Sequence, residues 1–416
     1  MMDRRSTRHR LTRLGIQVML IGVFGILGGS LKGLNLLVVV AAVTLGGLFA
    51  QWRVSLAMID ALRIHRRMPA EGFVGKPMRI RYQLHNSHRL MPLWLIRLED
   101  TLQRTSLMSG GGRPTSAAVG QLQHTMTGAG LLMPGQTTSA YFDVTVAYRG
   151  RYELNCWRVS STAPFALSTA SREFDGPPDF VDVYPRLLRL RRSWQRILPS
   201  QVGSLSAAAH RHGHADDEFF GLREYRHGDS PKHIHWRTTA RLNEPAVRQF
   251  EQQQRFDLCL LVDVWSDRPI TGSPYASGSD PLLIDDAIET AISLAASIAM
   301  ELTQGGENQV LLVVAGSGLD VVVGGPSVLG RKRMLQSLAH VVPSTSVAVG
   351  AALTQAAETA GRLPDLVVIS PRSQADAIAT DATTATALRQ WKTRSQISWV
   401  DVTDSGRHDW FGMEET

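Results

Sequence analysis

The chain has 416 residues, of which 44% are hydrophobic and 19% charged, enough for two or three domains with buried cores. This composition excludes a disordered tail and a solenoid of charged helices. Two cysteines exclude a disulfide framework and, unless histidine supplies the other ligands, a cysteine-based zinc site. The formal net charge is +7.

Residues 1–67 are predicted to form a basic N-terminus and a transmembrane hairpin. Uncharged apolar runs predict helices at about 14–31 and 34–51, each long enough to span most of a bilayer. Five arginines precede the first run and four follow the second, whereas the connection carries only Lys32. The positive-inside rule then predicts a multi-pass membrane protein with both termini in the cytoplasm. A signal peptide is the alternative, but no Ala-x-Ala site follows the first run.

Residues 68–190 show an alternation of period two. Met78, Ile80, Tyr82 and Leu84 alternate with polar residues, which predicts antiparallel strands with one buried face. Several short strands with turn residues between them indicate a small β-sandwich. The stretch 105–135, rich in Gly, Ser and Thr, is predicted to be a long loop or an insertion within it.

Residues 256–416 are predicted to be a doubly wound α/β domain. A continuous apolar strand at 256–264 is followed by alternating helices and strands, as in an open, mostly parallel sheet. Helices are expected at 283–302, 327–340, 348–362 and 380–394, and further strands at 310–314, 320–323, 366–370 and 397–402. The turn at 316–318 predicts a hairpin, and hence one antiparallel edge.

Residues 191–255 form a linker and a segment dense in charge and aromatic residues. We expect an ordered surface element beside the following sheet, with Trp236 and Tyr225 largely buried and Arg223 or Arg241 paired with carboxylates. An internal salt-bridge network is favoured over an arginine-rich docking surface for an acidic protein or a phosphate.

This segment resembles the signature of the domain-of-unknown-function-58 family. The residues that carry the resemblance, with the neighbouring His235 and Arg237, are Gly221, Leu222, Arg223, Tyr225, Gly228, Asp229, Ile234, Trp236, Ala240 and Arg241. The hairpin, Arg149–Tyr152 and Val183–Arg186 are also similar, whereas the family's Asp-Pro-Phe-Gly is Ala163–Ala166 here. The resemblance implies a C-terminal von Willebrand factor type A-like domain, with a MoxR-type AAA+ ATPase and transglutaminase-like membrane proteins as associates.

A type A domain would bind magnesium through oxygen ligands after its strands. The corresponding positions are degenerate here: Asp263 is in place, Trp265 and Asp267 replace two serines, Thr345 fits the threonine, and Ser370 replaces a later aspartate. We therefore expect no resident cofactor and no strong dependence on divalent ions, although Asp263 and Asp267 could hold magnesium weakly.

Other chemistry finds less support in the residues. His210, His212 and His214 alternate and could bind zinc or nickel, but a flexible polar linker is favoured. Cys156 and Cys259 are expected to be core residues, and no Gly-x-Ser-x-Gly nucleophile elbow is present. No catalytic residue is assigned.

The sequence thus favours a non-catalytic, membrane-anchored cytosolic scaffold or adaptor acting with a MoxR-type AAA+ ATPase in the assembly or maturation of protein complexes. A metal-dependent enzyme or receptor that uses Asp263 is one alternative. An anionic-lipid or nucleic-acid binder is another, although no specific nucleic acid is expected because much of the positive charge flanks the membrane helices.

Overall fold

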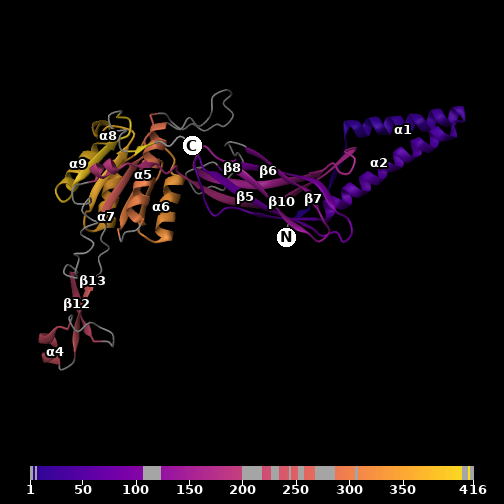
Figure 1. Cartoon of the computed structure of the whole chain (residues 1–416). Coiled ribbons are helices and arrows are strands. Elements are labelled where there is room, and N and C mark those ends of the chain that lie inside the picture. The colour runs from indigo at the N-terminus through magenta and orange to yellow at the C-terminus, as the bar shows by residue number, and fades with distance from the viewer. Residues whose placement is uncertain are drawn as a thin grey trace. The chain divides into compact units, whose positions relative to one another are not determined.

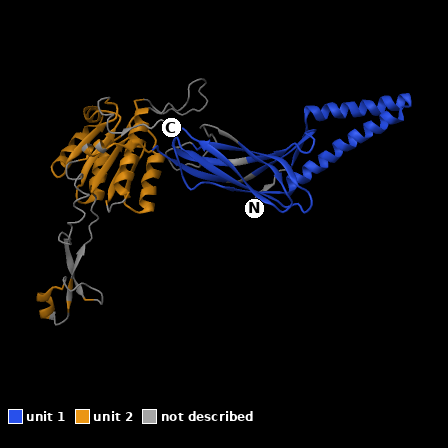
Figure 2. Cartoon of the chain, viewed as in Figure 1, with its two compact units in different colours: residues 1–186, 272–281 blue, residues 187–271, 282–416 orange. Residues whose placement is uncertain are grey.

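The computed structural model divides the chain into two compact units (Figures 1 and 2), the first built on residues 1–186 and the second on the rest of the described chain. The structure describes residues 3–4, 7–105, 123–198, 218–225, 234–242, 245–251, 257–267, 286–304, 308–404 and 411–412.

The first unit begins with a pair of apolar helices, α1 (Arg13–Lys32) and α2 (Asn35–Ala61). The Thr12 hydroxyl caps α1 by accepting a hydrogen bond from Gly15 N at 3.0 Å, and Gly33 makes the turn with φ +67°. Glycines let the helices approach closely, since a Cβ on Gly22 would lie 2.8 Å from the Leu45 side chain. Both helices are long and apolar enough to cross a membrane.

Helix α2 extends ten residues beyond the expected end at residue 51. Its last turns carry Met58 and Ile59, whose side chains are buried in the core of the strands that follow. After Trp52 the sequence contains polar as well as apolar residues. The uninterrupted apolar run therefore ends before the helix does. The hairpin is therefore continuous with the β region through one uninterrupted helix.

Two sheets share that core. In the larger one the strand order is β1-β10-β9-β6-β7, and β2 and β4 also pair with β10; the smaller has the order β3-β5-β8. Burial alternates along β5, as the sequence pattern predicts. Trp157 lies between Tyr82 and Phe174 at the centre. The strand bounds are β1 (Asp3–Arg4), β2 (Arg8–Leu11), β3 (Leu62–Arg67), β4 (Gly72–Phe73), β5 (Pro77–Asn86), β6 (Leu93–Arg104), β7 (Gln123–Leu132), β8 (Thr137–Thr145), β9 (Gly150–Ser161) and β10 (Ser168–Tyr184).

The predicted loop over 105–135 is wrong in its second half, where β7 pairs with β6. One of the glycines that indicated a loop, Gly128, serves close packing, because a Cβ there would lie 2.1 Å from the Ile96 carbonyl oxygen. Residues 106–122 lie outside the described part of the chain. The basic N-terminus also contributes to the sheet through β2, which pairs with β10.

The second unit contains a sheet of order β16-β15-β14-β17-β18. All its pairs are parallel except β15–β16, so the antiparallel edge predicted from the turn at 316–318 is confirmed. Helices α7 and α9 pack on one face in a core with Cys259 and Leu261, while α5 and α6 cover the other. The bounds are β14 (Leu258–Asp263), α5 (Asp286–Thr303), β15 (Val310–Ala315), β16 (Leu319–Gly324), α6 (Val328–His340), α7 (Val349–Ala360), β17 (Asp365–Ser370), α8 (Gln374–Thr380), α9 (Ala382–Lys392) and β18 (Ile397–Asp401).

The helix expected at 380–394 corresponds to α9, and the sequence did not predict the shorter α8 that precedes it. Asp381 separates the two helices. Its carboxylate caps α9 by accepting from Thr383 N, and its other oxygen accepts from Gly350 N and the Thr384 hydroxyl, each at 3.0 Å. These hydrogen bonds hold the pKa of Asp381 below its usual value, against the opposing effect of burial.

The segment between the two predicted domains has short elements of its own. A 3-10 helix covers Arg192–Ile197, and β11 (Arg189–Leu190) pairs with β19 (Phe411–Gly412). Strands β12 (Glu218–Glu224) and β13 (Ala246–Glu251) form a separate two-stranded sheet, with α4 (Trp236–Leu242) between them in sequence.

Candidate functional site

The carboxyl edge of the parallel sheet brings together residues that are far apart in sequence. Asp263 is the last residue of β14, Ser370 is the last residue of the neighbouring β17, and both are fully buried. Because the strands are parallel neighbours, their ends meet, and the Ser370 hydroxyl donates to Asp263 Oδ2 at 2.9 Å. Open α/β sheets bind ligands at this edge.

An arginine occupies the space beside the Asp263 carboxylate. Arg372 Nε donates to Oδ2 at 2.8 Å, Nη2 lies 3.5 Å from Oδ1, and the two side chains are 3% and 0% exposed. The turn after β17 fixes this position, since Arg372 N donates to the Ser370 hydroxyl at 3.1 Å. The pair is therefore a buried ion pair built into the strand ends.

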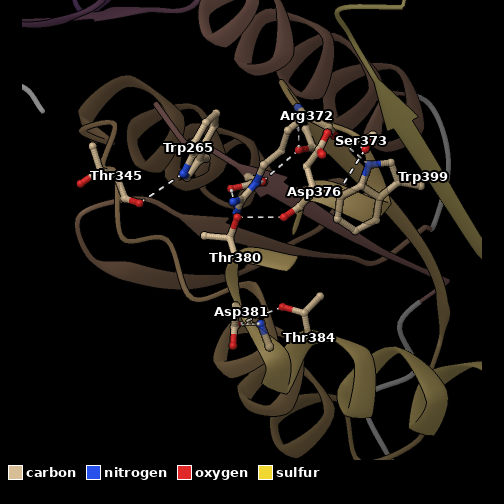
Figure 3. Close-up of polar contacts among 12 residues, drawn as sticks. Trp265, Thr345, Arg372, Ser373, Asp376, Thr380, Asp381, Thr384 and Trp399 are labelled. Atoms are coloured by element: carbon tan, nitrogen blue, oxygen red, sulfur yellow. Dashed lines mark hydrogen bonds and ion pairs between the residues drawn. The ribbon is translucent and has the colours of Figure 1, made fainter. Parts of the chain in front are cut away.

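Two tryptophans hold the arginine in place (Figure 3). The Arg372 guanidinium carbon lies 4.9 Å from the centroid of the Trp265 ring, a cation–π contact. Trp265 Nε1 donates to the Thr345 carbonyl oxygen at 3.2 Å, and Trp399 Nε1 donates to the Arg372 carbonyl oxygen at 3.1 Å. Trp265 is only partly buried, so its ring forms part of the surface above the ion pair.

Opposing effects act on the Asp263 carboxyl. Burial raises its pKa, while the Arg372 charge and hydrogen bonds from Arg372, Ser370 and the Trp265 backbone lower it, and burial is the larger effect. A buried carboxylate needs a nearby positive charge. Arg372 supplies that charge from within the chain.

The sequence-predicted metal positions come together only in part. Asp263, Trp265, Thr345 and Ser370 lie at one edge, but Thr345 contributes its carbonyl oxygen to Trp265, and Asp267 is exposed beyond the ion pair. In the described ranges, no three His, Cys, Asp or Glu side chains gather as a metal cluster. A cation at Asp263 would have to displace Arg372, so this donor set does not fit magnesium.

Sequence reasoning missed Arg372 and Trp399. The resemblance directs attention to Ser370, and it gives no indication that Arg372, two residues further on, pairs with Asp263. The position of Arg372, two residues after a buried strand, was the available signal for this pair. A guanidinium that is buried there needs a carboxylate partner. The position of Trp399 depends on β18 packing, which the sequence does not specify.

The signature residues lie mostly on the β12–β13 sheet and α4. Gly221, Leu222 and Arg223 are in β12, Ile234 bridges to Val247 of β13, and His235 Nδ1 lies 2.8 Å from the Thr238 hydroxyl at the start of α4. Gly228 and Asp229 fall outside the described residues, as do the alternating histidines at 210, 212 and 214.

The predicted burial of Trp236 and Tyr225 is wrong, because their exposed fractions are 66% and 37%. Trp236 begins a seven-residue helix that is too short to bury a face of its own, and Arg237 and Arg241 on the same helix are also exposed. The expected pairing of Arg223 or Arg241 with carboxylates stays a prediction, because the Arg223 side chain and the acidic residues Asp229 and Glu244 lie outside the described part of the chain. An exposed tryptophan among arginines is typical of a contact surface.

Replacing Trp236 by alanine should therefore leave stability nearly unchanged, within about 0.5 kcal/mol, because little apolar area is lost from the core. Trp391→Ala is the matched control: this tryptophan is 1% exposed, and its loss should cost ~3–5 kcal/mol. Urea unfolding of the full chain in detergent compares the two. A Trp236→Ala loss as large as that of Trp391→Ala would show that Trp236 belongs to a core.

Of the two cysteines, the structure describes the side chain of Cys259. Cys259 is fully buried in β14, as expected, and burial raises the pKa of its thiol. Cys156 lies in β9, as its alternating pattern predicts, but its side chain falls outside the described set.

Comparison with known proteins supports the family resemblance over part of the chain. The family model described as "Protein of unknown function DUF58" matches residues 221–409, which include the signature segment and the sheet with its Asp263–Arg372 pair. No curated protein matches the chain.

Solved structures give only weak similarity. An alkylpurine DNA glycosylase, AlkC of Pseudomonas fluorescens, aligns at 13% identity and TM-score 0.20 over 30% of each chain. The C-terminal domain of Wzt aligns at 11% identity and TM-score 0.22 over 30% of this chain and 75% of that one. A PapD-like domain of human CEP192 aligns at 12% identity and TM-score 0.19 over 30% and 83%. These similarities carry no functional argument.

Proposed function

We propose that this protein is a non-catalytic, membrane-anchored adaptor whose α/β unit is a von Willebrand factor type A-like domain that works without a metal ion. The buried Asp263–Arg372 pair carries this proposal. The guanidinium neutralises the carboxylate that would otherwise hold a cation, and Trp265 covers it. The carboxyl edge then presents aromatic and polar groups suited to binding a protein.

The anchor is the α1–α2 hairpin, proposed to span the membrane twice. By the positive-inside rule, the arginines that flank the two apolar runs favour a hairpin with both ends on the cytoplasmic side. The β region would then be a sandwich-like domain on the cytoplasmic face, and the α/β unit would be free to meet cytosolic partners.

The proposed partner is a MoxR-type AAA+ ATPase, with a transglutaminase-like membrane protein as a further associate. The family resemblance supplies these identities, and the matched residues 221–409 support the resemblance. Trp265 at the sheet edge and Trp236 on α4 are proposed as aromatic anchors, because Trp265 is only partly buried and Trp236 is exposed. The adaptor would link the ATPase to complexes being assembled or matured at the membrane.

The test maps the binding surface with purified components. Trp265→Ala and Asp267→Ala should each weaken capture of the ATPase by the full-length protein in detergent, because both remove groups from the carboxyl edge. Val328→Ala is the control: this side chain is 75% exposed and follows β16 at the opposite, amino edge of the sheet. Thermal melts accompany each variant.

Loss of capture at unchanged Tm would support an interface at Trp265. Loss of stability by Trp265→Ala would instead indicate that the ring mainly covers the ion pair. Capture of the ATPase by the Asp267→Ala variant would then decide whether this edge binds the partner. Equal capture by all three variants would exclude this edge as the binding surface.

A further inference from the structure

The turn between β9 and β10 packs against the start of α1 and the C-terminal part of α2. The Thr12 hydroxyl donates to the Ala166 carbonyl oxygen at 2.8 Å, and Thr12 N donates to Leu167 O at 3.0 Å. From α2, the Ser55 hydroxyl donates to the Ala163 carbonyl oxygen at 2.8 Å. Gly15 permits this approach, since a Cβ there would lie 1.8 Å from Leu167 O. The turn is thereby fixed to both helices.

An apolar groove of about 430 Å³ lies where this turn meets the helices. Its lining includes Val18 of α1, Val39, Val43 and Gly47 of α2, and Phe165 and Leu167 of the turn. Thr44 also lines it, but its hydroxyl is satisfied by the Val40 carbonyl oxygen at 2.6 Å. The groove therefore offers no free polar group to a ligand and is suited to a hydrocarbon chain.

Exposed arginines surround the base of the hairpin. Arg8 and Arg10 lie on β2, Arg13 begins α1, and Arg53 lies on α2. The strand is held beside α2 by the edge contact of His9 with Trp52, whose ring centroids are 6.1 Å apart. Asp60, an acidic residue near them, is already engaged by Arg172. The charge near the groove is thus positive, and Trp52 is of the kind found at membrane interfaces.

We infer that the groove is a binding site for an anionic phospholipid, with one acyl chain along Val18, Val43 and Phe165 and the phosphate near the arginines at the base. Phe165 is 63% exposed, and the turn from 162 to 168 carries no charge, so it can enter the hydrocarbon layer. Arginine recognises phosphate by charge and paired N–H groups. The inference rests on the proposed membrane anchoring.

Two neighbouring glycines give a matched pair of variants. A Cβ added at either Gly46 or Gly47 would have no atom within 4 Å, so both positions have open space for a side chain to begin, but only Gly47 lines the groove. Gly47→Leu should fill the groove, whereas Gly46→Leu adds the same side chain elsewhere on α2. Phe165→Ser, with the exposed Phe180→Ser as its control, tests the turn independently.

The experiment reconstitutes the full-length protein into phosphatidylcholine vesicles that contain a trace of phosphatidylglycerol with a photoactivatable acyl chain. We expect labelling of α2 and the 162–168 turn in wild type and in the Gly46 and Phe180 variants, and its loss in Gly47→Leu and Phe165→Ser. A phosphatidylcholine probe should label the groove less, and Arg10→Gln with Arg13→Gln should remove the difference.

Equal labelling of Gly47→Leu and Gly46→Leu would overturn the groove as the chain site, and equal labelling by the two probes would overturn the headgroup preference. An alkaline wash separates these results from failure of the anchor itself. Protein released by the wash would contradict the proposed membrane anchoring, whereas retained protein without groove labelling would contradict only the lipid site.

Discussion

Replacing Arg372 by alanine is expected to destabilise the α/β unit by ~3–5 kcal/mol, because Asp263 would be left as an uncompensated charge in a fully buried position. Hydrogen exchange of the β14 and β17 segments measures this effect locally, so the other unit does not obscure it. Faster exchange in both strands is the expected result.

The double variant Asp263→Ala with Arg372→Ala is the control for this prediction. It removes both charges and should recover part of the loss, because no buried charge is left unpaired. Wild-type protein should show no rise in Tm with millimolar magnesium, since Arg372 already faces the carboxylate. A magnesium-induced rise that Asp263→Ala abolishes would contradict the assignment of Arg372 as the internal cation.

Replacing Asp100 by alanine is expected to destabilise the β region by a similar ~3–5 kcal/mol. Asp100 accepts from Arg66 Nη1 at 2.9 Å and from the Tyr82 hydroxyl at 2.6 Å, and the Arg66 and Asp100 side chains are 6% and 0% exposed. Without Asp100, the buried Arg66 would keep only the half-exposed Asp179 and the Leu154 carbonyl oxygen as partners. The buried guanidinium would then lack a buried counter-charge.

The exposed pair Arg79–Asp143 gives the comparison within the same unit. These side chains are 65% and 47% exposed, so Asp143→Ala should cause no measurable change in hydrogen exchange of β5 and β6. Equal increases in hydrogen exchange for Asp143→Ala and Asp100→Ala would contradict the claim that burial makes the Arg66–Asp100 pair stabilising.

Local pattern predicted most of the fold. The alternation in β5 and the continuous apolar residues of β14 identified strands of the correct kind, because side-chain burial follows the period of the backbone. Strand β7 was missed because one of its glycines, Gly128, serves a contact with Ile96 that is remote in sequence. Helix α8 was not predicted, and Asp381, which separates it from α9, accepts a hydrogen bond from Gly350 N, 31 residues away.

The sequence predicted where the candidate site lies, but it did not predict that an arginine fills it. Parallel strand ends must meet, so Asp263 and Ser370 could be placed at one edge from the sequence alone. Which side chain fills the space between them depends on the turn after β17, and that turn directs Arg372 inward. Trp236 shows the opposite case, since aromatic content suggested a core where the described helix α4 is exposed.

The most direct measurement is a crosslinking pull-down of the full-length wild-type protein from its native membranes, read by mass spectrometry. The proposed function predicts recovery of a MoxR-type AAA+ ATPase, with crosslinks to the α/β unit near Trp265 or Trp236. Recovery should be lost in a Trp265→Ala, Trp236→Ala double variant that still inserts and folds. If no ATPase co-purifies with the wild-type protein, the adaptor proposal is contradicted, whatever the variants do.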